Sequence, residues 1–292
     1  MTHDTTLSIG ELAQLTGIPV RTIRFYCDNS LLDVARSAGG HRRFARSSVQ
    51  RLSTVRQLRA FGLGLTTIEE VLAGQRSLSE AVAAERRTVD RELALLSWRR
   101  ASLRAVEDAA PDERAARIGL LAAVQDDTAA REALVSFWHN AYLVRAPVDT
   151  VEMFLSVSAP LAPIEPTPAQ VLAYAGMVQV VRDASLRQRL AARVVVADQR
   201  TLHEGVGEAC ELARPLVAAG ERPRAGPALD RFVVAHAEAL RERDTPAFRR
   251  RLLAETEAER DPRLRRYWRL VGTLTGEEVT AGEAHAWLLD AL

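Results

Sequence analysis

The chain has 292 residues, of which 47% are hydrophobic, and its formal net charge at pH 7 is +1. This composition supports one large domain or two to three small ones, and it excludes a chain that is basic throughout. The charge is uneven, because residues 1–108 carry 16 arginines against 12 acidic residues, whereas residues 109–292 carry 23 against 26. A basic N-terminal part joined to an acidic remainder is typical of a nucleic-acid-binding module attached to another domain.

The cysteine content and the N-terminal sequence narrow the class of protein further. Cys27 and Cys210 are the two cysteines, and their spacing matches neither a metal site nor a disulfide framework, so we expect no metal and no cofactor. The N-terminus lacks the basic and apolar regions of a signal peptide, and no apolar run reaches membrane-spanning length. We therefore expect a cytoplasmic protein without a membrane partner. All 39 basic residues are arginine, so any charged contact to phosphate has to come from arginine.

The first predicted elements are two short helices joined by a turn. Ser8 and Glu11 have the spacing of a capping box, and apolar residues follow at helical intervals. Gly17 then allows a turn, and Pro19 suits the start of a second helix, which ends near Asn29. Two short helices around such a turn form a helix-turn-helix, in which the N-terminal residues of the second helix lie nearest the bases of DNA.

A β-hairpin and two more helices are predicted next. The segment "LLDVARSAGGHRRF", residues 31–44, contains a short apolar strand, a glycine turn and a returning basic strand. Ser47 and Gln50 have capping-box spacing before a helix that Gly62 ends, and the pair Thr67 and Glu70 opens another short helix.

These motifs together resemble the DNA-binding domain of the MerR family of transcription regulators. The matching residues are, in order, "SIGELAQLTGIPVRTIRFY", "LL", "R", "GGHRRF" and "LRAFGLGLTTIEEVL", and they cover roughly residues 7–74. The order and spacing of the helix-turn-helix, the wing and the second helix pair make the resemblance specific. Four positions depart from the family pattern, with Cys27, Ser30, Val34 and His41 standing where an acid or Gln, Gly, Pro and Tyr are usual.

The resemblance implies contacts with double-stranded DNA. Arg21 and Thr22 begin the second helix and would reach bases, whereas Phe25 lacks the tyrosine hydroxyl that is frequent at its position and is expected to pack. The complete set of predicted DNA-binding residues is Arg21, Thr22, Arg24, Phe25, Tyr26, Arg36, His41, Arg42 and Arg43.

A long helix without Gly or Pro is predicted from Ser77 to about Asp108. Hydrophobic residues recur in it at intervals of seven, and Glu and Arg occupy its polar faces, which is the pattern of a coiled-coil seam. The alternative is a long amphipathic helix packed on its own chain. Because MerR-like proteins pair through an antiparallel coiled coil at this place, the resemblance favours a homodimer. The predicted dimerisation residues are Val82, Val89, Leu93, Leu96 and Leu103.

The sequence pattern of residues 109–292 predicts an all-helical domain of about eight to ten helices. Cap residues followed by proline or by a capping-box partner begin helices at Thr167, Thr245 and Thr280. The Pro-rich segment 158–168 is expected to separate two helical blocks, and "RVVVAD" at 193–198 is the one short strand-like run, embedded in a helical pattern. The fold class is therefore all-α with a small β-hairpin wing, in three parts: 1–75, 76–108 and 109–292.

No enzyme motif stands out in the C-terminal part. "HEGVG" at His203 begins like a zinc-protease helix but has Gly207 in place of the second histidine, and the six histidines are expected at the surface or in the core. Aromatic residues gather locally and suit either a hydrophobic core or a ligand pocket. The segment "DPRLRRYWRLVG" faintly resembles the drug-binding domain of TipA-type regulators, without a motif that transfers binding residues. The candidate ligand residues are Trp138, Tyr142, Phe154, Tyr267 and Trp268.

Two functions fit these observations. The first is a dimeric transcription regulator that binds an inverted-repeat promoter operator, distorts the DNA in response to an organic ligand and thereby acts on RNA polymerase indirectly. The second is a constitutive repressor or architectural regulator whose helical domain binds a protein partner. An enzyme with a DNA-binding appendage is disfavoured because no catalytic constellation supports it.

Overall fold

The structure of the chain is a computed structural model that describes residues 6–37, 39–124, 127–192 and 196–292. Its internal contacts divide the chain into two compact units, Met1–Leu93 and Ala94–Leu292. One helix, α5 (Leu78–Glu107), contains the residues at which the units meet. The division of the chain into three functional parts, 1–75, 76–108 and 109–292, stays a prediction. None of the described helices is both long and apolar enough to span a membrane.

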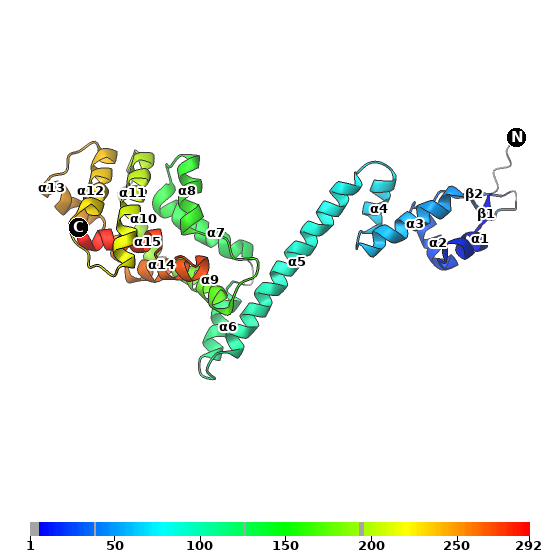
Figure 1. Cartoon of the computed structure of the whole chain (residues 1–292), viewed down its shortest axis with the longest axis horizontal. Helices are drawn as coiled ribbons and strands as arrows, with labels where there is room; N and C mark the ends of the chain where they lie inside the picture. The colour runs from blue at the N-terminus through cyan, green and yellow to red at the C-terminus, as the bar shows by residue number, and fades with distance from the viewer. Residues whose placement is uncertain (1–5, 38, 125–126, 193–195) are drawn as a thin grey trace. The chain divides into compact units, whose positions relative to one another are not determined.

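The first unit contains short helices and a small sheet before the start of α5 (Figure 1). Its elements are β1 (Leu7–Ser8), α1 (Ile9–Thr16), α2 (Val20–Asp28), β2 (Ala35–Arg36), β3 (Arg42–Phe44), α3 (Ser47–Ala60) and α4 (Leu65–Leu72).

The predicted helix-turn-helix is confirmed, and its local signals act as expected. The Ser8 hydroxyl accepts a hydrogen bond from the Glu11 amide, while the Glu11 carboxylate accepts one from the Ser8 amide, which completes the capping box of α1. Gly17 ends α1 with φ of 69°, a left-handed conformation that glycine adopts at little cost. Pro19 lies immediately before α2 as its N-cap residue and fixes the backbone that enters the helix.

The wing is confirmed, but it differs in detail from the prediction. The sheet has three antiparallel strands in the order β1-β3-β2, so Leu7 and Ser8 supply a strand that the sequence pattern did not reveal. Leu31 and Leu32 are not strand residues; their side chains are 0% and 3% exposed in the core, because the chain turns inward after α2. Strand β2 is therefore only two residues long.

Two predicted helix starts in this unit are wrong. Ser47 is already a residue of α3, whose N-cap is Arg46 and lacks a side-chain capping bond, so the predicted box with Gln50 is not formed. Helix α4 begins at Leu65, after Gly64 as N-cap, which leaves Thr67 inside the helix. In both cases the helix extends further toward the N-terminus than the spacing of polar residues indicates.

The second unit is built from helices alone among its described residues, in agreement with the predicted all-α class (Figure 1). Following α5, its elements are α6 (Arg114–Ala122), α7 (Asp127–Trp138), the π-helix η1 (His139–Leu143), α8 (Val148–Ser158), α9 (Pro168–Val181), α10 (Ala184–Ala191), α11 (Gln199–Ala218), α12 (Pro227–Leu240), α13 (Pro246–Glu255), the 3-10 helix η2 (Glu257–Arg260), α14 (Pro262–Thr275) and α15 (Ala281–Ala291). Residues 193–195 of the strand-like run "RVVVAD" lie outside the described residues.

The three predicted helix starts of this unit are confirmed. Thr167 and Thr280 form capping boxes with Gln170 and Glu283, and the Thr245 hydroxyl accepts a hydrogen bond from the backbone amide of Phe248. Each threonine satisfies an amide that the first turn of a helix leaves without an intrahelical partner.

The Pro-rich segment after Ser158 is a connector, but it does not separate two helical blocks. Leu134 of α7 and Val171 of α9 lie on its two sides and belong to one hydrophobic core, which also includes Val271 of α14. A second core of the same unit gathers residues of α11, α12, α13 and α15. The expectation of separate blocks is wrong because burial of the apolar face of α9 requires helices from both sides of the connector.

Candidate DNA-binding surface and ligand cavity

The second helix of the helix-turn-helix presents polar residues outward. Ile23 is 0% exposed and anchors α2 in the core, whereas Arg21 and Arg24 are exposed and Thr22 is half-buried. An exposed arginine provides up to five donors without requiring a conformational change of the fold. Helix α2 therefore presents guanidinium groups to solvent, and their contact with phosphate or base edges stays a prediction.

The two adjacent aromatic residues of α2 differ in environment. Tyr26 is half-buried and packs against two hydrophobic clusters, one around Leu12 and one around Val55. Phe25 is 51% exposed, so the expectation that it packs is wrong. The reason is helical geometry, because consecutive residues are about 100° apart and only one of the two can face the core.

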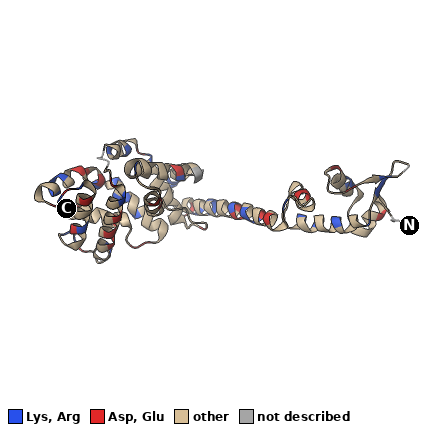
Figure 2. Cartoon of the chain, turned by 90° about the horizontal axis from the view of Figure 1, so that it is seen from above, with Lys and Arg blue, Asp and Glu red and all other residues tan. Residues whose placement is uncertain are grey.

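The wing adds arginines on both of its strands, and Figure 2 shows blue residues on the strands near the N-terminus. Arg36 and Arg42 are directly opposite in the β2–β3 pair, a placement of like charges that is unfavourable unless an anion lies nearby. Arg42 also donates to the Asp28 carboxylate at 3.1 Å, which ties the wing to the end of α2. Arg43 pairs with Ser8 of β1, and His41 is exposed in the turn.

Helix α5 has an exposed apolar stripe along one side. The predicted dimerisation residues are between 44% and 63% exposed: Val82, Val89, Leu93, Leu96 and Leu103. Other positions of the helix are buried in their own units, including Ala81 in the first and Ala101 in the second. Intrachain packing thus accounts for part of the helix surface but leaves this stripe in solvent.

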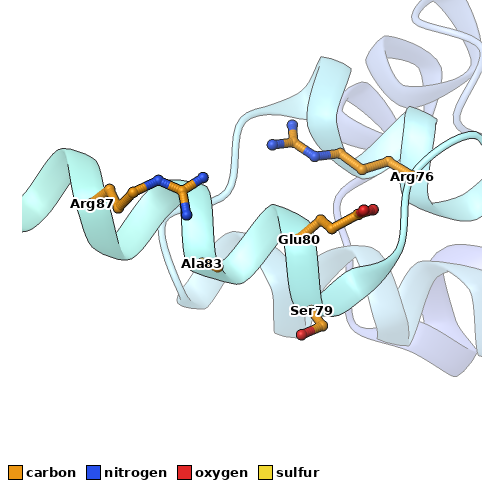
Figure 3. A pocket seen from close by; sticks show the side chains of 5 residues that line it. All are labelled: Arg76, Ser79, Glu80, Ala83 and Arg87. Atoms are coloured by element: carbon orange, nitrogen blue, oxygen red, sulfur yellow. The ribbon is translucent and has the colours of Figure 1, made fainter. Parts of the chain in front are cut away.

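A hollow at the start of α5 is polar and open to solvent. Arg76, Ser79, Glu80, Ala83 and Arg87 line it, and Figure 3 shows their side chains. The Glu80 carboxylate accepts hydrogen bonds from Ser77, which lower its pKa, and Arg76 pairs with Glu70 at 3.5 Å. The bonds between Ser77 and Glu80 cap the first turn of α5, and the Arg76–Glu70 pair connects the segment before α5 to α4, so we assign no ligand to this hollow.

The second unit contains a cavity of about 290 Å³ with an aromatic wall. Trp138, Tyr142, Phe154 and Trp268, four of the five candidate ligand residues, line it, and their role in ligand binding stays a prediction. The rings are in contact, with 5.3 Å between the centroids of Trp138 and Trp268 and a stacked pair between Tyr142 and Phe154. Trp138 ends α7 where the π-helix η1 begins, and the wider turn of η1 carries Tyr142.

Tyr267, the fifth predicted ligand residue, is not part of this wall. Its side chain is 0% exposed, and its hydroxyl accepts a hydrogen bond from Trp138 Nε1 at 2.9 Å and donates to the carbonyl of Ser158. Burial raises the pKa of the Tyr267 hydroxyl. The prediction is therefore corrected, since Tyr267 supports the cavity wall from behind and lies in the core.

Three histidines and the carboxylate of Glu259 also line the cavity, and none of them is among the ligand residues predicted from the sequence. His203 is in edge contact with Phe154 at 5.1 Å between ring centroids, and His285 Nε2 lies 3.4 Å from the Glu259 carboxylate. His236 Nδ1 lies 2.9 Å from the Phe232 carbonyl oxygen; because a carbonyl only accepts, Nδ1 carries the proton and donates it. These residues come from α11, α12, η2 and α15, so no local spacing relates them.

The remaining lining includes a cysteine and a tightly packed glycine. Burial raises the pKa of the Cys210 thiol to about 12, so this thiol stays protonated at neutral pH. A Cβ at Gly282 would lie 1.8 Å from the indole of Trp268, which shows that the α15 backbone supports this ring at contact distance. A smaller cavity of about 130 Å³ shares Leu202, His236 and Glu259 with the larger one. Among the described residues there is no group of histidine, cysteine or acidic side chains arranged to hold a metal ion.

Comparison with known proteins gives a family match for residues of the first unit. The model of the "MerR HTH family regulatory protein" matches residues 7–75. Nodulation protein NolA of Bradyrhizobium elkanii is 37% identical over 97 residues, which cover 33% of this chain and 44% of that protein. The HTH-type transcriptional activator SoxR homolog of Chromobacterium violaceum is 36% identical over 71 residues, 24% of this chain and 48% of that protein. The HTH-type transcriptional regulator ZntR of Escherichia coli is 36% identical over 66 residues, 22% of this chain and 47% of that protein.

The similarity spans less than half the length of each of these relatives. No solved structure matches the chain. Two of these three relatives are named as transcription regulators. The family match and the observed helix-turn-helix with its wing coincide, so the chain carries over residues 7–75 a helix-turn-helix domain of the MerR family.

Proposed function

We propose that the chain is a homodimeric, DNA-binding transcription regulator of the MerR type. The observation that carries the proposal is a MerR-family domain whose α2 and wing expose arginines on a correctly ordered helix-turn-helix. Residues 1–75 would bind double-stranded DNA, 76–108 would form the dimer, and 109–292 would bind an effector. Arginine–phosphate contacts would set the register on DNA, and α2 would read bases in the major groove.

Dimerisation through α5 is supported by the exposed stripe from Val82 to Leu103. An apolar stripe at seven-residue spacing becomes stable when a second helix covers it. A two-fold dimer presents two copies of α2, which matches the symmetry of an inverted-repeat operator.

The mode of regulation follows from the family resemblance and from DNA mechanics. The dimer would bend and untwist a promoter whose −35 and −10 elements lie too far apart, so that RNA polymerase can engage both. Such deformation costs about 1–10 kcal/mol, and protein–DNA contacts must offset it. An organic effector can shift the equilibrium only if it binds the two states with different affinity.

The cavity favours a small-molecule effector over a protein partner for the second unit. Its aromatic lining and its volume of about 290 Å³ suit an organic compound. A constitutive repressor or architectural protein would need an interaction surface but no such cavity.

A DNase I footprint on the region upstream of the chain's own gene, with mapped transcription starts, tests the proposal. We expect protection of an inverted repeat between −35 and −10 elements that have an overlong spacer, with enhanced cleavage at the centre where the DNA is distorted. Protection over a normally spaced promoter would contradict the activating mechanism, but it would still agree with a DNA-binding regulator. The absence of any protected site at low salt would contradict DNA binding itself.

A further inference from the structure

We propose that a groove between α7 and α10, apart from the cavity with the aromatic wall, binds a small organic anion: a carboxylate attached to an apolar body. The α7–α10 groove has a volume of about 460 Å³, which is in the range of small-molecule sites. The inference goes beyond the proposed function, because it depends neither on DNA binding nor on an effector in the aromatic cavity.

The deepest lining residues of the α7–α10 groove are apolar. Phe137, Val181 and Leu190 line it, and all three are buried in the same hydrophobic core. Alanines of α7, η1 and α10 stand beside them, and such short side chains leave room above the buried floor. A hydrocarbon body that lies on this floor removes apolar surface of both partners from water, which favours binding.

The polar lining residues of the groove suit an anion. Arg182, the C-cap residue of α9, and Arg187 of α10 bring two positive charges. Ser136, Asn140 and Gln188 add hydroxyl and amide groups that can donate hydrogen bonds. Among the described residues that line the groove there is no acidic side chain. A carboxylate therefore meets donors and positive charge here, whereas a cation would meet like charge.

The two arginines differ in the bonds that they already make. Arg182 Nη1 donates to the Ala123 carbonyl at 3.0 Å, which uses one of the five donors of its guanidinium. Arg187 is exposed and forms no hydrogen bond or ion pair with another residue in the described part of the chain. We therefore assign the ligand carboxylate to Arg187. An exposed ion pair contributes little by itself, so the apolar floor supplies affinity and the arginine supplies selectivity.

The α7–α10 groove and the aromatic cavity have separate linings on shared elements. Phe137 and Ala141 line the groove, whereas Trp138 and Tyr142 line the cavity. Adjacent positions of a helix point about 100° apart, which directs the neighbours to different sites. The rings of Phe137 and Trp138 are in edge contact, with 5.1 Å between their centroids. A side chain that fills one site is therefore expected to leave the other open.

Three naphthalene probes of nearly equal shape test the preference for an anion: 2-naphthoate, the neutral 2-naphthamide and the cationic 2-naphthamidine. Each is titrated at pH 7 and low salt into full-length protein freed of nucleic acid, and NMR of the probe measures even weak affinity. We expect one 2-naphthoate per chain, bound at least about threefold more tightly than the amide, with the amidine weakest. No binding of 2-naphthoate, equal affinities, or a preference for the amide or amidine would overturn the proposal.

A charge variant identifies the cationic partner. Arg187→Gln should lower the affinity for 2-naphthoate about threefold and leave 2-naphthamide binding unchanged, because only the charge of the side chain is lost. Arg250→Gln, at an exposed arginine of α13, is the matched control and should change neither affinity. Unchanged binding of 2-naphthoate by Arg187→Gln would overturn the assignment.

Two bulky variants distinguish the α7–α10 groove from the aromatic cavity. Ala184→Trp places a ring at the groove from the exposed start of α10 and should weaken the binding of all three probes. Val206→Phe, which fills the aromatic cavity from α11, should leave 2-naphthoate binding unchanged. Loss of binding in Val206→Phe, with normal binding in Ala184→Trp, would show that the probe occupies the aromatic cavity and that the proposal is wrong. Circular dichroism of each variant confirms that it is folded.

Discussion

Trp138 Nε1 donates a hydrogen bond of 2.9 Å to the hydroxyl of Tyr267, and both groups are buried. The Tyr267 hydroxyl in turn donates a hydrogen bond to the Ser158 carbonyl at the end of α8. This chain of bonds connects α7, α14 and α8, three elements that hold the cavity wall. One hydroxyl thus satisfies a buried donor and a buried acceptor from segments distant in sequence.

Tyr267→Phe should lower the free energy of unfolding of the second unit by about 1–3 kcal/mol, because the substitution leaves the Trp138 indole N–H and the Ser158 carbonyl without this partner. All four tryptophans, Trp98, Trp138, Trp268 and Trp287, lie in the second unit, so tryptophan fluorescence during urea unfolding reports on it. A midpoint equal to that of the wild type would contradict the structural role of this hydroxyl.

Ser30→Gly should stabilise the first unit by about 0.5–1 kcal/mol. Ser30 has φ of 56°, in the left-handed region, at a position where the resemblance to the MerR family leads us to expect glycine. Ser30→Ala is the matched control, because it removes the hydroxyl but keeps the Cβ that disfavours this backbone. The gain should appear in far-UV circular dichroism and leave the tryptophan transition unchanged; a gain from both variants would exclude backbone strain as the cause.

Local signals explain what could be predicted from the sequence. The Ser8–Glu11 box, Gly17 and the cap threonines act within a few residues, and the structure confirms them. The pattern at Ser47 failed because α3 starts one residue earlier than a cap at that position requires. β1 was missed because a two-residue strand has no periodicity of its own and depends on pairing with β3.

The cavity shows the limit of local reasoning. Its aromatic residues were recognised as local concentrations, but sequence could not separate Tyr267 in the core from its neighbour Trp268 at the cavity. His203 and His285 are more than 80 residues apart in the chain, and only the packing of α11, α12, α14 and α15 brings them to one space.

Asp261→Asn should destabilise the second unit by about 1–3 kcal/mol at pH 7. The Asp261 carboxylate is 2% exposed and pairs with Arg263 at 2.7 Å and Arg189 at 3.0 Å. Its hydrogen bonds with Arg263 hold its pKa below the usual value. A lowered folded pKa stabilises the protein above the unfolded pKa of about 4, and this contribution is lost as the pH falls through the folded value.

The difference in unfolding free energy between wild type and Asp261→Asn should therefore shrink below about pH 4. Asparagine can still accept the amide of Arg263 as the N-cap of α14, so the comparison isolates the charge. If this difference in unfolding free energy is constant from pH 7 to pH 3, the ion pairs of Asp261 do not contribute to stability.

Arg24→Ala should weaken binding to operator and random DNA alike and reduce the slope of log K against log salt by about 1, because one phosphate contact is lost. Arg250→Ala is the control, an exposed arginine on α13 in the second unit. Fluorescence anisotropy at several salt concentrations measures both slopes. If affinity for the operator falls while binding to random DNA is unchanged, Arg24 contacts a base instead of a phosphate.

Leu96→Glu should dissociate the dimer, whereas Leu95→Glu should not, although both leucines are exposed, at 60% and 58%. Adjacent positions on a helix are about 100° apart, so Leu95 points away from the stripe that contains Val89 and Leu103. A buried, unpaired glutamate at the seam is costly, but the same residue in solvent is nearly neutral. Light scattering should give the monomer mass for Leu96→Glu and the dimer mass for Leu95→Glu. Because a monomer retains only one α2, operator affinity should fall with the first variant alone; dissociation by Leu95→Glu instead would move the seam to the other side of α5.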